Sequence, residues 1–437
     1  MRPRRGHREA CPRLFADQGV GPVAITTSRS PAAVSGTRTT ERRFLPELEG
    51  MRGLAALGVL CTHVGFSSGM VGFMDKEPDG FFGVMLQQLH VSLPIFFVLS
   101  GMLLYRPFAL ATIAGTRKPE IKPYFWRRAL RTLPAYWVLV AVTLITLNRE
   151  AVHSVWQVLR PLLLLQVYQL DARLTGNGTE QTWTLATEIA FYAALPLLAW
   201  ALDKFAGRAG DPGTRTRRVL WGLTPLVLIG FVYAWYTFLP SMGDYPAQNE
   251  WPPKWLGFIA VGMGLAALSA CADVAPDRVP AFYRFVQKNP VWCWAIAIGI
   301  YLLACLRPIG QPGHADYPSM AGGMTEHFLY TLFGLFLVAP VTVPKPSRFV
   351  VGAMSNPVMR FLGRISYGLY LWHIAVIYFW RGDLMPRGSF LGLFAVTLTG
   401  AVVLATASFY LIESPAMRLR ERLGKASARP SVETIAP

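Results

Sequence analysis

Residues 389–412, SFLGLFAVTLTGAVVLATASFYLI, contain no charged side chain. As a helix rising about 1.5 Å per residue, this stretch is long enough to cross the roughly 30 Å of hydrocarbon in a bilayer. The rest of the chain has the same character, since 53% of its residues are hydrophobic and only 15% are charged. That balance is too apolar for soluble domains. We therefore predict an all-α fold, a polytopic transmembrane helical bundle that meets lipid over much of its surface.

Nine more stretches have a similar length and composition, so the sequence predicts about ten membrane spans. Residues 154–170 are also apolar, but Gln157, Arg160 and Gln166 favour a surface or re-entrant helix over an eleventh span. The ten predicted spans are 51–67, 84–105, 132–148, 183–202, 219–238, 255–272, 290–306, 326–341, 365–380 and 389–412.

The positive charges support this topology. With both termini in the cytoplasm, 34 of the 42 lysines and arginines fall in cytoplasmic segments, as the positive-inside rule requires. We interpret residues 1–45 as a disordered basic cytoplasmic tail, 46–415 as the membrane domain and 416–437 as a second cytoplasmic tail. Because the basic residues form short clusters between apolar stretches, the net charge of +17 indicates contact with membrane lipid and not with nucleic acid.

The first predicted span carries two ionisable residues, Arg52 and His63, which are functional candidates because charge inside a bilayer is costly. His63 comes eleven positions after Arg52, about 16 Å and close to three turns along a helix, so they share a helix face and His63 lies near the bilayer midplane. Imidazole suits proton transfer near neutral pH. The alternative is a packed histidine with Arg52 as an interfacial anchor.

Glu188 lies in the fourth span, about 8 Å from Trp183 along the helix axis. Measured from opposite membrane edges, Glu188 and His63 are expected within about one helical turn of each other in depth. They could therefore form one catalytic centre. A structural hydrogen bond between two helices is the alternative for Glu188.

Two further groups are candidates for substrate binding. Arg128 and Arg131 are one turn apart at the start of the third span, a geometry suited to gripping phosphates, although basic helix ends are often topology anchors. In the ninth span, Ser366, Tyr370 and His373 are spaced to share a face, with structural and functional readings equally open. The cysteines and histidines show no metal-binding pattern, and no metal is expected.

Taken together, these motifs resemble the acyltransferase-3 family of membrane O-acyltransferases from about residue 43 to residue 415. Each motif is short, but five in the expected order are specific. They are Arg52-Gly53 with His63 after ten intervening residues, Phe96 to Gly101, the Arg128 and Arg131 pair, Trp183 to Tyr192 with Glu188, and Gly363 to Tyr367.

The resemblance implies transfer of an acyl group from cytoplasmic acyl-CoA, used as a substrate with no bound cofactor, to a hydroxyl of a sugar, glycan or lipid acceptor. It implies Arg52, His63 and Glu188 as catalytic residues and Arg128 and Arg131 as the donor-side pair, in a protein of the bacterial plasma membrane. We expect His63 to act as general base, with Glu188 orienting it. We also expect the membrane domain to act without the C-terminal hydrolase-like domain of some relatives.

The rival interpretation is a polytopic transporter or flippase for a small polar or lipid-linked solute, in which the same charges form a substrate path. Against it, the sequence shows neither inverted repeats nor paired helices broken by Gly and Pro.

Overall fold

The structure is a computed structural model that describes residues 46–72, 77–168, 176–243, 245–307, 309 and 318–419. The predicted N-terminal tail lies outside the described residues. Of the predicted C-terminal tail, only 416–419 are described, and they continue the last helix. Every regular element in the described residues is helical, as predicted.

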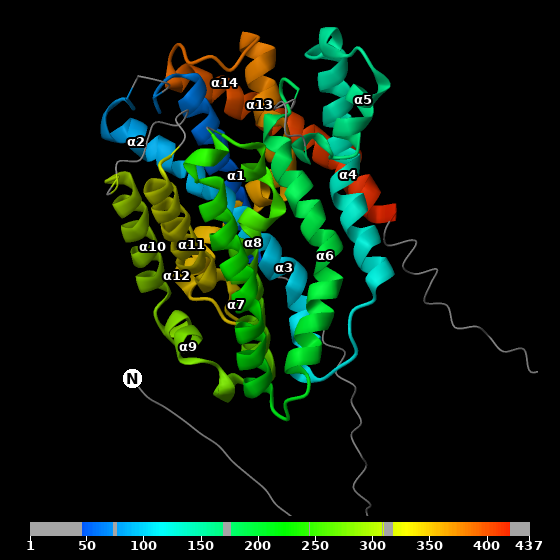
Figure 1. Ribbon diagram of the computed structural model, residues 1–437, viewed down its shortest axis with the longest axis vertical. Helices are drawn as coiled ribbons and strands as arrows, with labels where there is room; N and C mark the ends of the chain where they lie inside the picture. Colours follow the sequence, from blue (N-terminus) through cyan, green and yellow to red (C-terminus); the bar gives the residue numbers. More distant parts are fainter. Residues whose placement is uncertain are drawn as a thin grey trace, which may run out of the picture. The chain divides into compact units, whose positions relative to one another are not determined.

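Each predicted span overlaps a different one of the longer helices, but the predicted span 84–105 begins in a short helix and a 3₁₀ turn before its long helix (Figure 1). The longer helices are α1 (Pro46–Ser67), α3 (Ser92–Ala114), α4 (Ile121–Thr146), α6 (Trp183–Ala206), α7 (Pro212–Thr237), α8 (Pro252–Val274), α10 (Pro290–Cys305), α11 (Met320–Thr342), α13 (Pro357–Arg381) and α14 (Phe390–Ser408). The shorter ones are α2 (Gly80–Gln88), α5 (Val155–Leu162), α9 (Ala281–Lys288) and α12 (Arg348–Met354). Among the single-turn elements, η1 (Leu89–Val91), η4 (Glu180–Thr182) and η6 (Ala247–Glu250) are 3₁₀ turns, and η8 (Phe409–Glu413) is a π-helix.

Length and composition qualify seven of the described helical segments to cross a membrane, or eight if α9 and α10, bent by 99° at their junction, form one span. The two remaining predicted spans, α1 and α13, have 22 and 25 residues. They differ from the others because they carry polar and charged side chains on an otherwise apolar helix. Helix α5 has only eight residues, too few to span, in agreement with the prediction for 154–170.

Burial separates the inner helices from the outer ones. In the segment that contains α8, 83% of the most apolar stretch of 18 residues is buried inside the protein. The corresponding share is 22% in α7 and in the segment that contains α14. Large apolar side chains such as Trp221 on α7 and Leu391 on α14 are exposed, as lipid contact requires. The polar helix α1 packs along α13, so protein surrounds its ionisable residues.

Glycines allow the closest helix pairs to approach. A Cβ atom on Gly53 of α1 would lie 2.8 Å from the backbone nitrogen of Gly363 on α13. Between α3 and α8, a Cβ on Gly262 would lie 1.9 Å from the carbonyl oxygen of Val98. Small residues at such contacts are a common means of helix association in membranes.

We expect Gly262→Ala to destabilise the protein, because the added methyl group must push α3 away from α8, at a cost of about 1–3 kcal/mol or more. Gly264→Ala on the same helix is the matched control. Its Cβ meets Leu220 at an ordinary 3.5 Å, and alanine favours the helix by roughly 0.5–1 kcal/mol. Melting temperatures of the purified proteins should therefore shift in opposite directions. Equal shifts would contradict the close α3–α8 contact.

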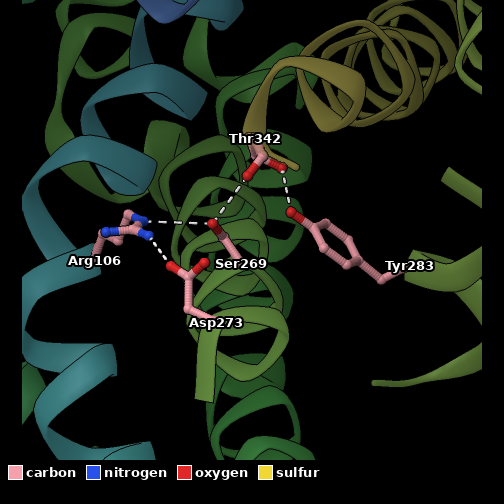
Figure 2. Close-up of polar contacts among 5 residues, drawn as sticks. All are labelled: Arg106, Ser269, Asp273, Tyr283 and Thr342. Carbon is pink, nitrogen blue, oxygen red and sulfur yellow. Dashed lines mark hydrogen bonds and ion pairs between the residues drawn. The ribbon is translucent and has the colours of Figure 1, made fainter. Parts of the chain in front are cut away.

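A polar network ties the C-terminal halves of α3, α8 and α11 to the short amphipathic helix α9 (Figure 2). Arg106 of α3 forms an ion pair with Asp273 of α8. Ser269 of α8 donates to the carbonyl of Thr342 on α11 (2.9 Å), and the Thr342 hydroxyl lies 3.0 Å from the hydroxyl of Tyr283 on α9. The network satisfies polar groups that would otherwise be buried without partners.

Candidate functional site

A cavity of about 210 Å³ lies among α1, α3, α4, α6 and α13. Six residues proposed from the sequence line it: Arg52, Arg128, Arg131, Glu188, Ser366 and Tyr370. The other polar residues of its wall are Ser100, Thr132, Thr184, Tyr192 and Tyr367, and the apolar ones are Leu93, Phe96, Phe97, Leu99, Leu103, Leu104, Leu185 and Leu371. Residues from five helices, far apart in sequence, thus meet around one space.

Positive charge dominates the wall of this cavity, because three arginines face one glutamate. Arg52 lies close enough to Arg131 and to Glu188 to interact electrostatically with both. The Glu188 carboxylate accepts a hydrogen bond from the hydroxyl of Ser100. Arg128 has an unused hydrogen-bond donor, because its Nε is buried and has no hydrogen-bond partner among the described residues. The cavity is therefore suited to an anionic ligand.

The two arginines of α4 are held by hydrogen bonds around their helix. The hydroxyl of Thr132 donates to the carbonyl of Arg128 (2.9 Å), and the hydroxyl of Tyr367 on α13 donates to the carbonyl of Thr132 (2.7 Å). Tyr124, one turn before Arg128, donates to the carbonyl of Tyr192 on α6 (3.1 Å). These contacts fix α4 against α13 and α6, and so fix where its arginines point.

Tyr370 lines the cavity and lies one turn before His373 on α13. Its hydroxyl donates to the carbonyl of Gln181 (2.9 Å) and lies 2.6 Å from the hydroxyl of Thr184, while its ring meets Phe96 edge to face. Ser366, one turn earlier on α13, is fully buried, and its hydroxyl donates to the carbonyl of Gly363 (2.8 Å). The Ser366 hydroxyl proton is thus already engaged by the helix backbone.

His63 is not part of the cavity wall and lies beside His373, one turn beyond Tyr370 on α13. Its Nδ1 lies 2.9 Å from the carbonyl oxygen of Val59 and 3.3 Å from Nε2 of His373. Nδ1 of His373 lies 2.7 Å from the carbonyl of Tyr370, so that nitrogen carries the proton and Nε2 of His373 is an acceptor. His63 then carries its proton on Nδ1, and its Nε2 lone pair is left without a hydrogen bond to any described residue. This is the tautomer that a general base requires.

The predicted meeting of His63 and Glu188 does not occur, because α6 starts deeper than its sequence suggests. The preceding turn η4 is buried, with Gln181 and Thr182 only 3% and 1% exposed. Gln181 Nε2 donates to the carbonyl of Leu371, midway along α13. Helix α6 therefore begins at a turn that is buried in the protein, and Glu188 lies among the arginines and not beside the histidine.

One residue of the site escaped the sequence analysis. Glu413 is 5% exposed, accepts from the hydroxyl of Ser408 (3.2 Å) and interacts electrostatically with Arg131 and Arg52. It lies in the π-helix η8, where one turn is wider than in an α-helix. Such π-helical turns are rare and often occur at functional sites. The sequence did contain a signal for Glu413. The residue directly follows the uncharged 24-residue stretch 389–412, and a carboxylate at the end of a membrane span needs a partner for its charge.

A family model and several curated proteins match this chain. Residues 45–412, which include all the residues above except Glu413, match the model of the acyltransferase domain known as acyltransferase-3. Three relatives show the level of similarity. A Staphylococcus aureus protein provisionally named an O-acetyltransferase is 23% identical over 394 residues, covering 87% of this chain and 58% of its own. The peptidoglycan O-acetyltransferase OatA of Listeria monocytogenes is 22% identical over 399 residues, 86% of this chain and 57% of its own. A Bacillus subtilis protein provisionally named a peptidoglycan O-acetyltransferase is 24% identical over 359 residues, 78% of this chain and 50% of its own.

The chain thus spans between 50% and 58% of the length of these curated relatives. No solved structure matches it.

Proposed function

Because the chain belongs to the acyltransferase-3 family, we propose that it is a membrane O-acyltransferase that moves an acyl group from acyl-CoA to a hydroxyl of a glycan. The observation that carries the proposal is the arginine-lined cavity whose wall includes Tyr370, one turn from the paired histidine His373. Family membership also favours an enzyme over the transporter considered above. Acetyl is the acyl group we propose, since the relatives are named for O-acetyl transfer.

The donor would enter at the arginine end of the cavity. A CoA molecule carries several phosphates, and arginine guanidinium groups bind phosphate through paired, charge-assisted hydrogen bonds. Arg128 and Arg131 are the proposed phosphate ligands, with the unpartnered Nε of Arg128 as one donor. Arg52 would bind a further anionic group of the donor. Glu188 would hold Ser100 and offset part of the positive charge while the cavity is empty.

The acyl thioester would extend along the cavity past Tyr370 toward His63. The Nε2 lone pair of His63 takes the proton of the acceptor hydroxyl as its oxygen attacks the thioester carbonyl. When the carbon–sulfur bond breaks, the imidazolium returns that proton to the CoA thiolate. His373 acts as a positioning residue, because it shares with the Val59 carbonyl the contacts that keep the His63 proton on Nδ1. The mechanism needs no metal or cofactor and no acyl-enzyme.

This mechanism requires that α1 and α13 also cross the membrane. Their polar residues face one another and the cavity instead of lipid, which explains why composition alone does not single them out. With them, the ten predicted spans place both termini in the cytoplasm, the arginines toward that side and His63 further out. The protein would then work in the bacterial plasma membrane, with a glycan acceptor presented from outside.

The test uses the purified full chain in lipid nanodiscs with radiolabelled acetyl-CoA and soluble N-acetylglucosamine oligomers. CoA should be released in proportion to acceptor, and label should appear on the oligomer as an alkali-labile ester. Binding of acetyl-CoA should saturate without acceptor. Uptake of unmodified solute into proteoliposomes, with no CoA released for any hydroxyl acceptor, would reject the proposal.

A further inference from the structure

A second cavity, of about 100 Å³, lies beside the C-terminal end of α4. Its wall is formed by α4, α5, the 3₁₀ turn η3 (Gln166–Tyr168) and the residues that lead into η4. Thr143 in this wall comes twelve positions after Arg131, about 18 Å further along the same helix. Helix α5 lies beyond that end of α4 (Figure 1). The second cavity is therefore on the side of the protein where we place the acceptor.

Most polar side chains of this wall are hydrogen-bonded within the protein. Nδ2 of Asn148 donates to the carbonyls of Thr143 and Asn177 (both 3.0 Å). Oδ1 of Asn148 accepts from the backbone N–H of Asn177 (2.7 Å). The hydroxyl of Thr182 donates to the carbonyl of Thr179 (2.7 Å). Because each of these groups is held by its own partners, the wall has a fixed shape before any ligand binds.

Two polar side chains of the wall have unused hydrogen-bonding groups. Gln166 is 5% exposed, and its Nε2 donates to the hydroxyl of Thr182 (3.1 Å). Its Oε1, in contrast, is buried and has no hydrogen-bond partner among the described residues. The guanidinium of Arg160 lies over the Trp156 ring, 5.5 Å from the ring centre, and donates no hydrogen bond to any described residue. Since a buried acceptor without a partner is costly, the wall is suited to a ligand that donates to Gln166 and accepts from Arg160.

The size of the cavity and its apolar wall narrow the choice of ligand. A water molecule occupies about 30 Å³ of the liquid, so a cavity of about 100 Å³ suits a group of a few heavy atoms and not a whole sugar. Val140, Leu144 and Val152 form an apolar part of the wall. An acetamido group has an N–H that donates, a carbonyl oxygen that accepts and a methyl group that covers apolar surface. A lone hydroxyl could form both hydrogen bonds, but it would leave the apolar part unfilled.

The residues before η4 and η4 itself also pack against α13, near the histidine pair. A Cβ atom on Gly178 would lie 3.3 Å from the Cα of Ala375, two residues after His373. Gln181 of η4 donates to the carbonyl of Leu371, two residues before His373. This part of the cavity wall is therefore held at the level of His373. A glycan anchored in the cavity would lie at the depth at which the transfer is proposed to occur.

We propose that this cavity is an acceptor subsite that binds the acetamido group of an N-acetylated glycan. Oε1 of Gln166 accepts a hydrogen bond from the acetamido N–H, and Arg160 donates to the acetamido carbonyl oxygen. The hydroxyl that reacts at His63 belongs to the same glycan. The inference rests on the proposed acyl transfer, but it concerns acceptor binding, which can be measured without turnover.

The experiment compares the binding of two soluble oligomers to the full chain in nanodiscs, by calorimetry without acyl-CoA. One is an oligomer of N-acetylglucosamine, and the other is the glucose oligomer with the same linkage, which has a hydroxyl in place of each acetamido group. The cavity variants are Arg160→Met and Gln166→Met, which keep the length of the side chain. Arg149→Met, at an exposed arginine outside the cavity wall, is the matched control. The KM for acetyl-CoA is measured for all four proteins.

We expect the wild type and Arg149→Met to bind the N-acetylglucosamine oligomer at least about tenfold more tightly than the glucose oligomer, because two hydrogen bonds, one of them from a charged group, depend on the acetamido group. Each cavity variant should lose most of that preference, with the KM for acetyl-CoA within about twofold of wild type. Gln166→Met also loses the hydrogen bond to Thr182. If it does not fold, Arg160→Met decides the question, since no described residue accepts a hydrogen bond from Arg160.

Equal binding of the two oligomers by the wild type, or an unchanged preference in Arg160→Met, would overturn the inference. CoA release by the same protein would then leave the proposed function intact. A preference that depends on Arg160 and Gln166, without CoA release for either oligomer, would support the subsite and reject the proposed function.

Discussion

Replacing His63 by alanine is expected to lower the rate of acyl transfer roughly 10²–10⁴-fold, the usual contribution of a positioned general base. The loss should fall on kcat, because His63 lies beyond the donor cavity and its removal leaves the arginines in place. Imidazole added to the buffer should restore part of the activity of His63→Ala. In the wild type the rate should rise with pH on the acidic side, since only neutral imidazole can accept a proton.

Two companion variants separate catalysis from packing. His373→Ala should lower kcat less than His63→Ala, because it removes one of the two contacts to Nδ1 that position the base and leaves the base itself and the Val59 contact in place. The double variant should then be scarcely worse than His63→Ala, since residues that act as a unit are not additive. His153→Ala, at an exposed position, should have no effect. Near-normal turnover of His63→Ala would exclude His63 as the base.

The sequence was sufficient for the helical membrane fold and for the members of the cavity. Apolar length identifies most spans because lipid imposes it. Charged residues inside spans are few, so Arg52, Arg128, Arg131 and Glu188 stood out one by one, and the structure brings all four to one cavity.

The sequence did not predict which side chains meet. Depth counted along a helix assumes that the helix starts at the membrane edge, and the buried turn η4 before α6 breaks that assumption for Glu188. The partner of His63 is His373, more than 300 residues away in sequence, and their contact depends on the close crossing of α1 and α13 at Gly53 and Gly363. Such contacts are properties of tertiary packing, which no local pattern encodes.

The arginine pair of α4 gives the second large expected effect. Arg128→Ala combined with Arg131→Ala should raise the KM for acetyl-CoA about 10²–10⁴-fold. Hydrogen bonds to charged groups contribute roughly 1.5–3 kcal/mol each, and every 1.4 kcal/mol is about tenfold in affinity. The KM for the glycan should change little, because the two arginines line the proposed donor cavity and His63, at which the acceptor hydroxyl reacts, does not. The ratio of the two KM changes is therefore the informative quantity.

Charge alone does not account for the expected effect. Arg131→Lys keeps the positive charge but loses the planar fork, so it should recover only part of the lost affinity. Arg127→Ala removes an arginine from the same helix that does not line the cavity, and it should leave the KM for acetyl-CoA unchanged. If Arg127→Ala weakens donor binding as much as the double variant does, or if neither does, the arginines of α4 are anchors for lipid headgroups. The buried Nε of Arg128 argues against that outcome, because a headgroup anchor keeps its guanidinium in water and does not leave a donor unpaired inside the protein.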